Sequence, residues 1–152
     1  MHFTIARLIG VCALLSVPSP LVAHEDATGV VKERMDLMET QKDAMKVIGD
    51  MAKGQKPFDA AKAGAAALEI EVTAAKIPEL FPEGTVGEPS EAKPEIWTQW
   101  DEFTADAEQL ETAAAALKVA LDGESPEWKA KFKGVIDSCK ACHKTFRVKK
   151  DQ

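Results

Sequence analysis

The chain has 152 residues, of which 45% are hydrophobic and 29% charged, and its formal net charge at pH 7 is −6. This length suits one domain with a single core. A general nucleic-acid binder carries a basic stripe, and none is visible in the sequence, so we expect no nucleic-acid partner. Tyr is absent. Good helix formers such as Ala, Glu, Lys and Leu are abundant, which predicts an all-α protein.

The first 23 residues predict a secretory signal peptide. Arg7 gives a basic start, an apolar run extends from Leu8 to Val17, and a proline-containing stretch ends at Ala23. This is the three-part layout of an export signal, so we expect cleavage after Ala23 and a mature domain of residues 24–152. The alternative of a membrane-anchoring or amphipathic helix is disfavoured because the apolar run is shorter than a membrane span needs. A lipoprotein attached at Cys12 is the other alternative.

After cleavage at Ala23 the chain retains 18 basic and 25 acidic residues, a net charge of −7. An acidic surface favours a partner with a basic docking face. No long apolar run follows residue 23, so we expect no membrane span in the mature chain.

Four segments carry residues at alternating steps of three and four, which predicts four helices separated by Gly and Pro. The inward-facing positions that this spacing predicts are Val31, Arg34, Met38, Gln41, Met45, Ile48 and Ala52 in the first segment; Phe58, Ala61, Ala65, Leu68, Val72 and Ala75 in the second; Ile96, Trp100, Phe103, Ala107, Leu110, Ala114, Leu117 and Leu121 in the third; and Trp128, Phe132, Val135, Cys139, Cys142 and Phe146 in the fourth.

Helices of this kind bury their inward faces together, which predicts an antiparallel four-helix bundle with up-down-up-down topology. One connection, from Ile77 to Lys93, is longer than the usual bundle loop. We interpret it either as a lid over a site or as a flexible crossover.

Two predicted inward faces contain polar or reactive residues. Arg34 and Gln41 flank Met38 in the first segment, and two cysteines lie in the last. An unpartnered buried arginine costs several kcal/mol. The pattern therefore indicates a buried anion or a solvent channel near Arg34. The alternative is that the predicted inward face of this helix is incorrect at Arg34.

The most specific motif is Cys139-Lys140-Ala141-Cys142-His143. On a helix, residues three and four apart project from nearly one face, so both thiols and the imidazole lie together. Cys-x-x-Cys-His is the attachment signature of c-type haem, in which the thiols bond to the porphyrin and the imidazole reaches the iron. The predicted export signal fits this interpretation.

Three alternatives compete with covalent haem. A structural zinc site needs four ligands, and His24 is the only other histidine of the mature chain. A thioredoxin-type redox pair belongs in a βαβ setting, for which the sequence shows no strand pattern. A disulfide between residues three apart on one helix is sterically awkward.

The chain resembles the class II c-type cytochromes, the cytochrome c prime family, in which the haem motif lies on the last helix of a four-helix bundle. Beside the motif, followed by Phe146 and Arg147, three stretches carry the resemblance: Arg34-Met35-Asp36-Leu37-Met38, residues 45–54, and Leu80-Phe81-Pro82-Glu83-Gly84. The resemblance covers nearly all of the mature chain. It implies a periplasmic protein with one covalent haem c, and a homodimer packed through the first two helices.

The resemblance also implies roles for individual residues. Met38 matches the position at which the low-spin branch supplies a methionine ligand opposite His143, whereas the high-spin branch leaves the iron five-coordinate; ordinary core packing is the alternative for Met38. Arg34 is expected near a haem propionate, or else solvated at the bundle edge. Arg147 is expected to set proximal electrostatics or to complement the helix dipole, and Phe81 to contact the haem edge or to anchor its loop.

These features predict a single-haem electron carrier whose iron is ligated by His143 and Met38 and whose partners are redox proteins. The alternative is a five-coordinate protein that binds nitric oxide or carbon monoxide. A haem enzyme such as a peroxidase is disfavoured because no distal histidine is available, so we expect no enzymatic activity.

Overall fold

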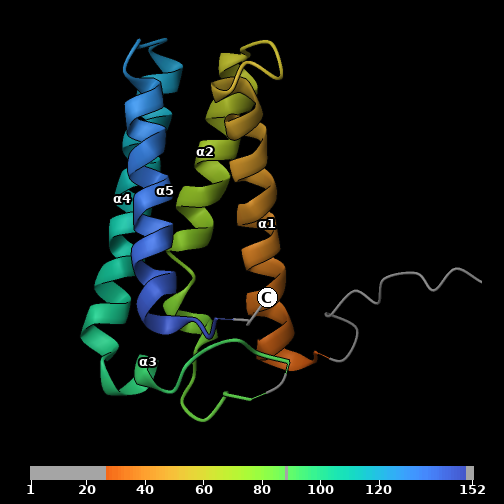
Figure 1. Cartoon of the computed structure of the whole chain (residues 1–152), viewed down its shortest axis with the longest axis vertical. Coiled ribbons are helices and arrows are strands. Elements are labelled where there is room, and N and C mark those ends of the chain that lie inside the picture. The colour runs from red at the N-terminus through yellow and green to blue at the C-terminus, as the bar shows by residue number, and fades with distance from the viewer. Residues whose placement is uncertain (1–26, 88, 150–152) are drawn as a thin grey trace, which may run out of the picture.

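The structure, a computed structural model, describes residues 27–87 and 89–149, and in this part of the chain it is a bundle of four long helices. Figure 1 shows them running alternately up and down, as predicted. The described elements are α1 (Gly29–Ala52), α2 (Ala60–Ala74), the 3-10 turn η1 (Pro78–Leu80), α3 (Glu95–Thr98), α4 (Trp100–Asp122) and α5 (Trp128–Phe146). The predicted signal peptide, its cleavage site and Cys12 lie outside the described residues.

Local sequence signals set several helix boundaries. Gly54 adopts a positive φ of 72° just after α1, a conformation that glycine adopts without steric cost. Asp59 caps α2 by accepting a hydrogen bond from the Lys62 amide at 3.0 Å. The third predicted helix is wrong in one respect, since a break at Gln99 divides it into α3, which contains Ile96, and α4, which begins at Trp100.

The helices do not all pack equally closely. The close neighbours are α1 with α2, α2 with α4, and α4 with α5, whereas α1 and α5 are not a closely packed pair. Figure 1 shows α1 and α5 on opposite sides of the front of the bundle. The beginning of α1 and the end of α5 lie at the same end of the molecule, which is where the residues singled out in the sequence are found.

The prediction for α2 is wrong, because the face expected to be inward is exposed. Leu68 and Val72 are each 42% exposed. The residues that are buried instead lie on the opposite side of the helix: Ala63, Gly64, Ala67, Ile70, Thr73 and Ala74. Both faces of this alanine-rich helix are apolar, so periodicity alone did not choose between them. The small-residue face lets α2 approach α4 closely, and a Cβ added at Gly64 would lie 2.7 Å from Asp122.

The predictions for the last two long helices are largely confirmed. In α4 all the predicted positions from Phe103 to Leu121 are buried, and in α5 the two cysteines alone among the predicted positions are only half-buried. In α1 the buried face is rotated slightly, since Leu37, Ala44 and Met51 are buried while Met38 and Met45 are partly buried.

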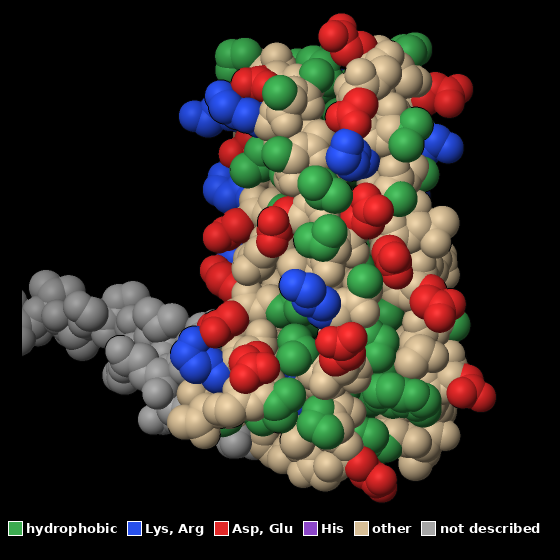
Figure 2. Space-filling view, turned by 180° about the vertical axis from the view of Figure 1, so that it is seen from behind, with side chains coloured by type: hydrophobic (Ala, Val, Ile, Leu, Met, Phe, Trp, Pro, Cys, Tyr) green, Lys and Arg blue, Asp and Glu red, His purple; other side chains and the backbone are tan. Residues whose placement is uncertain are grey.

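Exposed apolar side chains remain on the outer side of the first two helices. Figure 2, which shows the molecule from behind, has green hydrophobic side chains scattered among acidic ones. Within the described residues, no helix is both long enough and apolar enough to cross a membrane.

Candidate haem-attachment site

The last two turns of α5 carry the Cys-x-x-Cys-His motif. Burial of Phe132, Val135 and Phe146 fixes the rotation of this helix about its axis. In that orientation Cys139 and Cys142 are half-buried and pack against the core. His143 lies at the edge of the same face and is exposed.

Both thiols are free, and their surroundings keep them protonated. Burial raises the pKa of Cys139. Burial also raises the pKa of Cys142, to about 12, and electrostatic interactions with Asp106 and Cys139 raise it by smaller amounts. Reactive redox cysteines instead have lowered pKa values, so this environment disfavours a thioredoxin-type pair. In residues 27–87 and 89–149 no group of three or more His, Cys, Asp or Glu side chains is arranged to hold a metal ion.

The His143 side chain forms no hydrogen bond or ion pair with any described residue. Partial burial lowers its pKa, the positive charge of Arg147 lowers it further, and the carboxylate of Glu91 opposes both. The imidazole is therefore neutral near pH 7, which is the form that ligates a metal ion.

Arg34 of α1 is the most deeply buried charged residue of the described chain, with 3% of its surface exposed. Its guanidinium donates to the side-chain oxygens of Thr85 at 3.0 Å and Ser90 at 2.6 Å and to the Thr85 carbonyl, and it lies 4.8 Å from the centre of the Phe81 ring. Among the described residues no carboxylate pairs with it. Burial lowers its pKa, yet an arginine stays charged, so a buried positive charge faces only neutral partners.

The two residues that follow Arg34 in the predicted inward face differ in their surroundings. Met38 is partly buried and packs against the core. Gln41 is buried and donates to the Thr73 hydroxyl of α2 at 3.1 Å. Gln41 therefore has its own partner on α2 and requires neither an anion nor a solvent channel.

Aromatic rings close the end of the bundle beside these residues. Phe103 packs edge-on against Phe81 and Phe146, with ring centres 4.9 and 5.4 Å apart. The Trp97 indole donates to the Phe81 carbonyl at 2.9 Å. These contacts anchor Phe81 and its loop, which was one of the two roles expected for it.

The long connection between α2 and α3 ties α1 to α5, and we call its described residues 85–87 and 89–93 the strap. At one end of the strap, Thr85 and Ser90 hold Arg34. At the other end, the Lys93 amide donates to the Phe146 carbonyl at 2.9 Å and the Val148 amide donates to the Glu91 carbonyl at 2.8 Å. Anchored at both ends, the strap is a fixed crossover over this end of the bundle (Figure 1).

Arg147, directly after α5, contacts the strap. Its guanidinium pairs with the Glu91 carboxylate at 2.6 Å, and an isolated β-bridge joins Arg147 to Ala92. Arg147 lies beyond the last residue of α5 with an extended backbone. Its charge is close enough to lower the pKa of His143, in keeping with the expected electrostatic role on that side.

Four residues of this region were not singled out from the sequence: Thr85, Ser90, Glu91 and Asp106. Thr85, Ser90 and Glu91 form hydrogen bonds with arginines more than fifty residues away in the sequence. A local sequence pattern does not predict such contacts. Asp106 shares the α4 face next to Cys142, where burial and the charge of Glu102 raise its pKa. The only sequence signal for Asp106 was its place directly before Ala107, one of the predicted inward-facing positions of α4.

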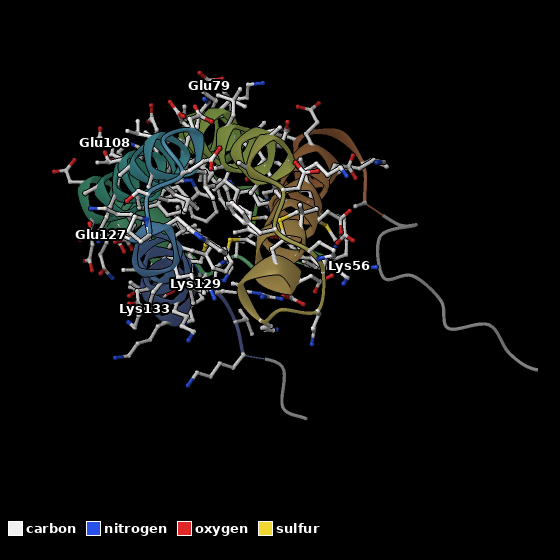
Figure 3. All side chains as sticks on the ribbon, turned by 90° about the horizontal axis from the view of Figure 1, so that it is seen from above. Lys56, Glu79, Glu108, Glu127, Lys129 and Lys133 are labelled. Carbon is white, nitrogen blue, oxygen red and sulfur yellow. The ribbon has the colours of Figure 1, made fainter. Side chains whose placement is uncertain are left out.

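The residues present fit a covalently attached haem. Two neutral free thiols and a neutral imidazole that has no hydrogen-bond or ion-pair partner among the described residues lie on one face of α5. A buried guanidinium that pairs with no carboxylate of residues 27–87 or 89–149 lies at the same end of the bundle, on a helix that does not pack closely against α5. Figure 3, which looks down the bundle, shows sulfur atoms in the interior between α1 and α5.

Comparison with known proteins agrees with this donor set. The family model described as Cytochrome C' matches residues 29–147. The chain belongs to the cytochrome c' family. Cytochrome c-556 of Agrobacterium fabrum is 36% identical over 124 residues, which cover 82% of this chain and 84% of the relative. Cytochrome c' of Pararhodospirillum photometricum is 36% identical over 119 residues, covering 77% of this chain and 94% of the relative.

Solved structures of the family have the same fold. Cytochrome c' from Rhodopseudomonas palustris superposes with a TM-score of 0.74 at 31% identity, covering 82% of this chain and all of that one. The nitric oxide complex of a variant of cytochrome c prime from Alcaligenes xylosoxidans has a TM-score of 0.73 at 31% identity, covering 80% of this chain and 94% of that one. As a cytochrome c' family protein, the chain is a c-type cytochrome whose cofactor is covalently bound haem c.

Proposed function

We propose that this cytochrome c' family protein is a periplasmic single-haem electron carrier. In this proposal Cys139 and Cys142 would hold the haem through thioethers, and His143 and Met38 would ligate its iron. The observation that carries the proposal is the shared location of these groups at one end of two helices, α1 and α5, that do not pack closely together. The haem supplies one-electron chemistry at its iron.

The protein's own residues have distinct tasks in this proposal. The raised thiol pKa values keep Cys139 and Cys142 neutral until attachment. Arg34 neutralises a haem propionate, which would give its buried charge the anion that no described side chain supplies. Thr85 and Ser90 of the strap accept hydrogen bonds from Arg34, which would orient the guanidinium for such an anion.

A second candidate is a five-coordinate protein that binds nitric oxide or carbon monoxide, with Met38 serving as core packing. Similar solved structures favour it, since three of them are cytochrome c prime variants with bound nitric oxide. The partial burial of Met38 against the core is compatible with either role. Neither candidate assigns an enzymatic reaction to the protein.

The sixth iron position separates the two candidates. Electron transfer with Met38 as ligand predicts a thioether-to-iron charge-transfer band in the ferric spectrum, which disappears in Met38→Ala, and slow carbon monoxide uptake by the ferrous protein. Met45→Ala, a change of a partly buried methionine one heptad later on the same helix, is the matched control and should keep the band. A wild-type spectrum without the band, with rapid carbon monoxide uptake, would establish the gas-binding candidate instead.

We also propose a homodimer packed through α1 and α2. Val47 of α1 and Leu68 and Val72 of α2 are each 40–42% exposed, and burial of such apolar side chains stabilises an association. Light scattering of the eluting protein should give twice the chain mass, and Leu68→Lys/Val72→Lys should give the monomer mass with an unchanged helical spectrum. If the wild type is a monomer at about 100 µM, a dimer with a dissociation constant below that concentration is excluded.

A further inference from the structure

Charge is divided very unevenly between α5 and the rest of the molecule. The stretch 128–149 contains seven basic residues and a single acidic one, Asp137. In the remainder of the described chain, acidic residues outnumber basic ones two to one. The helix that carries the haem motif is therefore basic within a protein whose net charge is negative.

Four basic residues of α5 lie along one side of the helix, and one of them, Lys133, forms an ion pair with Asp137. Lys129, Lys133, Lys140 and Lys144 follow one another at steps of four, seven and four residues, which places them along one side of the helix. All four are exposed, and we call them the lysine stripe. Figure 3 shows Lys129 and Lys133 extending outward from α5, away from the bundle.

The lysine stripe borders the exposed imidazole of the haem motif. His143 follows Lys140 by three residues and directly precedes Lys144, and Arg147 comes one turn later. His143 and Arg147 are themselves exposed. Lys140, Lys144 and Arg147 thus place positive charge beside His143, although the charge of Arg147 is shared with its partner Glu91.

The opposite side of the molecule has the opposite charge. Figure 2 shows the back of the bundle, formed by α2 and α4, with more red acidic side chains than blue basic ones. In Figure 3, Glu79 and Glu108 lie on this side while Lys129 and Lys133 lie on the side of α5. A charged partner approaching the protein therefore meets a field whose sign depends on the face it approaches.

We propose that the lysine stripe with Arg147 is the docking surface for a redox partner that presents an acidic face. The proposal rests on the electron-carrier function proposed above and reverses the partner charge that the net charge of the sequence favours. At about 0.1 M salt the screening length is about 10 Å, which is shorter than a 19-residue helix. A docking partner therefore responds to the charges near His143 more than to the total charge of the protein.

The first test uses charge alone and involves no electron transfer. The holoprotein is applied at pH 7 and low salt to a sulfonate cation-exchange resin, which retains a net-negative protein only if it has a local positive face. We expect retention of the wild type, loss of retention in Lys140→Glu/Lys144→Glu, and retention of the matched control Lys53→Glu/Lys56→Glu, whose exposed lysines lie where α1 ends. Passage of the wild type through the resin, or equal loss in both variants, would overturn the proposal.

Lys140 lies between the two haem-attaching cysteines, so a second variant protects the test against failed attachment. Lys144→Glu/Lys149→Glu removes charge from the same face outside the Cys-x-x-Cys segment. It should also lose retention.

The second test measures electron transfer to two probes of opposite charge. In stopped flow, the reduced protein gives one electron to hexacyanoferrate(III), an anion, or to tris(phenanthroline)cobalt(III), a cation. At about 0.1 M salt the rate constant with the anion should fall at least about fivefold in the α5 variants and less than about twofold in the control, while the rate with the cation should rise in the α5 variants. Equal responses of all variants to each probe would show that net charge, and not the lysine stripe, controls the approach.

The two tests distinguish failure of the docking surface from failure of the electron-carrier function. If the protein does not exchange electrons with either probe, the function fails while resin retention is unaffected. If electrons are exchanged but neither retention nor rate depends on the α5 lysines, the docking surface fails and the function stands.

Discussion

The two sides of the bundle are held together in different ways. Where α2 meets α4, small side chains allow the helices to pack closely, and Ala63, Ala67 and Ala114 are fully buried there. Where α1 faces α5, the helices are not close neighbours, and the residues on that side include a buried arginine and two half-buried thiols. The first side is a complete protein core, whereas the second carries chemical groups suited to a cofactor.

Because α1 and α5 do not pack closely, the strap has a structural role on their side of the bundle. Direct side-chain packing stabilises the α2–α4 side. On the other side, hydrogen bonds from Thr85 and Ser90 to Arg34, and from the strap backbone to the end of α5, connect two helices that lack such packing. The ends of α1 and α5 that carry these groups are therefore connected through the strap rather than by direct helix–helix packing.

The largest effect is expected from removing bulk from the α2–α4 side. Ile70→Ala deletes a fully buried side chain and should lower the free energy of unfolding by about 2–5 kcal/mol. At a protein concentration low enough to keep the chain monomeric, Leu68→Ala, two residues earlier on the exposed face, should change it by less than about 0.5 kcal/mol. Urea denaturation followed by circular dichroism measures both. The opposite order would mean that α2 buries the face that periodicity alone predicted.

Adding bulk to the same interface should have a smaller effect. Ala67→Leu forces a larger side chain between α2 and α4 and is expected to cost about 1–3 kcal/mol of stability. Ala65→Leu makes the same change on the exposed side of the helix and serves as the control. Denaturation midpoints that coincide for the two variants would show that close approach of the helices is not required.

On the cofactor side, Arg34→Gln should lower stability by about 1–3 kcal/mol, because the strap loses hydrogen bonds from a charged donor. Hydrogen exchange should accelerate selectively at the amides of Ser90 and Lys93. Lys42→Gln, an exposed change on the same helix, should leave these amides protected. Unchanged exchange at the strap in Arg34→Gln would contradict the anchoring role.

The smallest effect is expected at Asp106, whose pKa is raised by burial and by Glu102. Because its pKa is higher in the folded than in the unfolded state, the native protein binds the proton more tightly, and stability falls as pH rises through the interval between the two values. Asp106→Asn should lack this decrease, so it should be the more stable protein at pH 7 and lose that advantage below the unfolded pKa. Thermal melts across pH 3–7, about the range of carboxyl titration, test the sign.

The sequence was sufficient for the fold class and for the motif, but not for the contacts around it. Apolar residues recur at steps of three and four from Phe103 to Leu121, so the buried face of α4 could be predicted. In α2 both faces are apolar, and the choice between them depends on how closely α4 can approach, which only the folded structure shows. Arg34 was recognised from local spacing and Arg147 from the family resemblance, whereas their partners Thr85, Ser90 and Glu91 are distant in sequence and could not be recognised.

The central claim is that Cys139 and Cys142 each form a bond to one haem. Intact-mass spectrometry of the denatured protein, made together with a c-type haem maturation system, measures this directly. The account predicts a chain heavier by one haem in the wild type and a chain without added mass in Cys139→Ser/Cys142→Ser. A wild-type chain of unmodified mass, or haem mass that persists in the double variant, would contradict it.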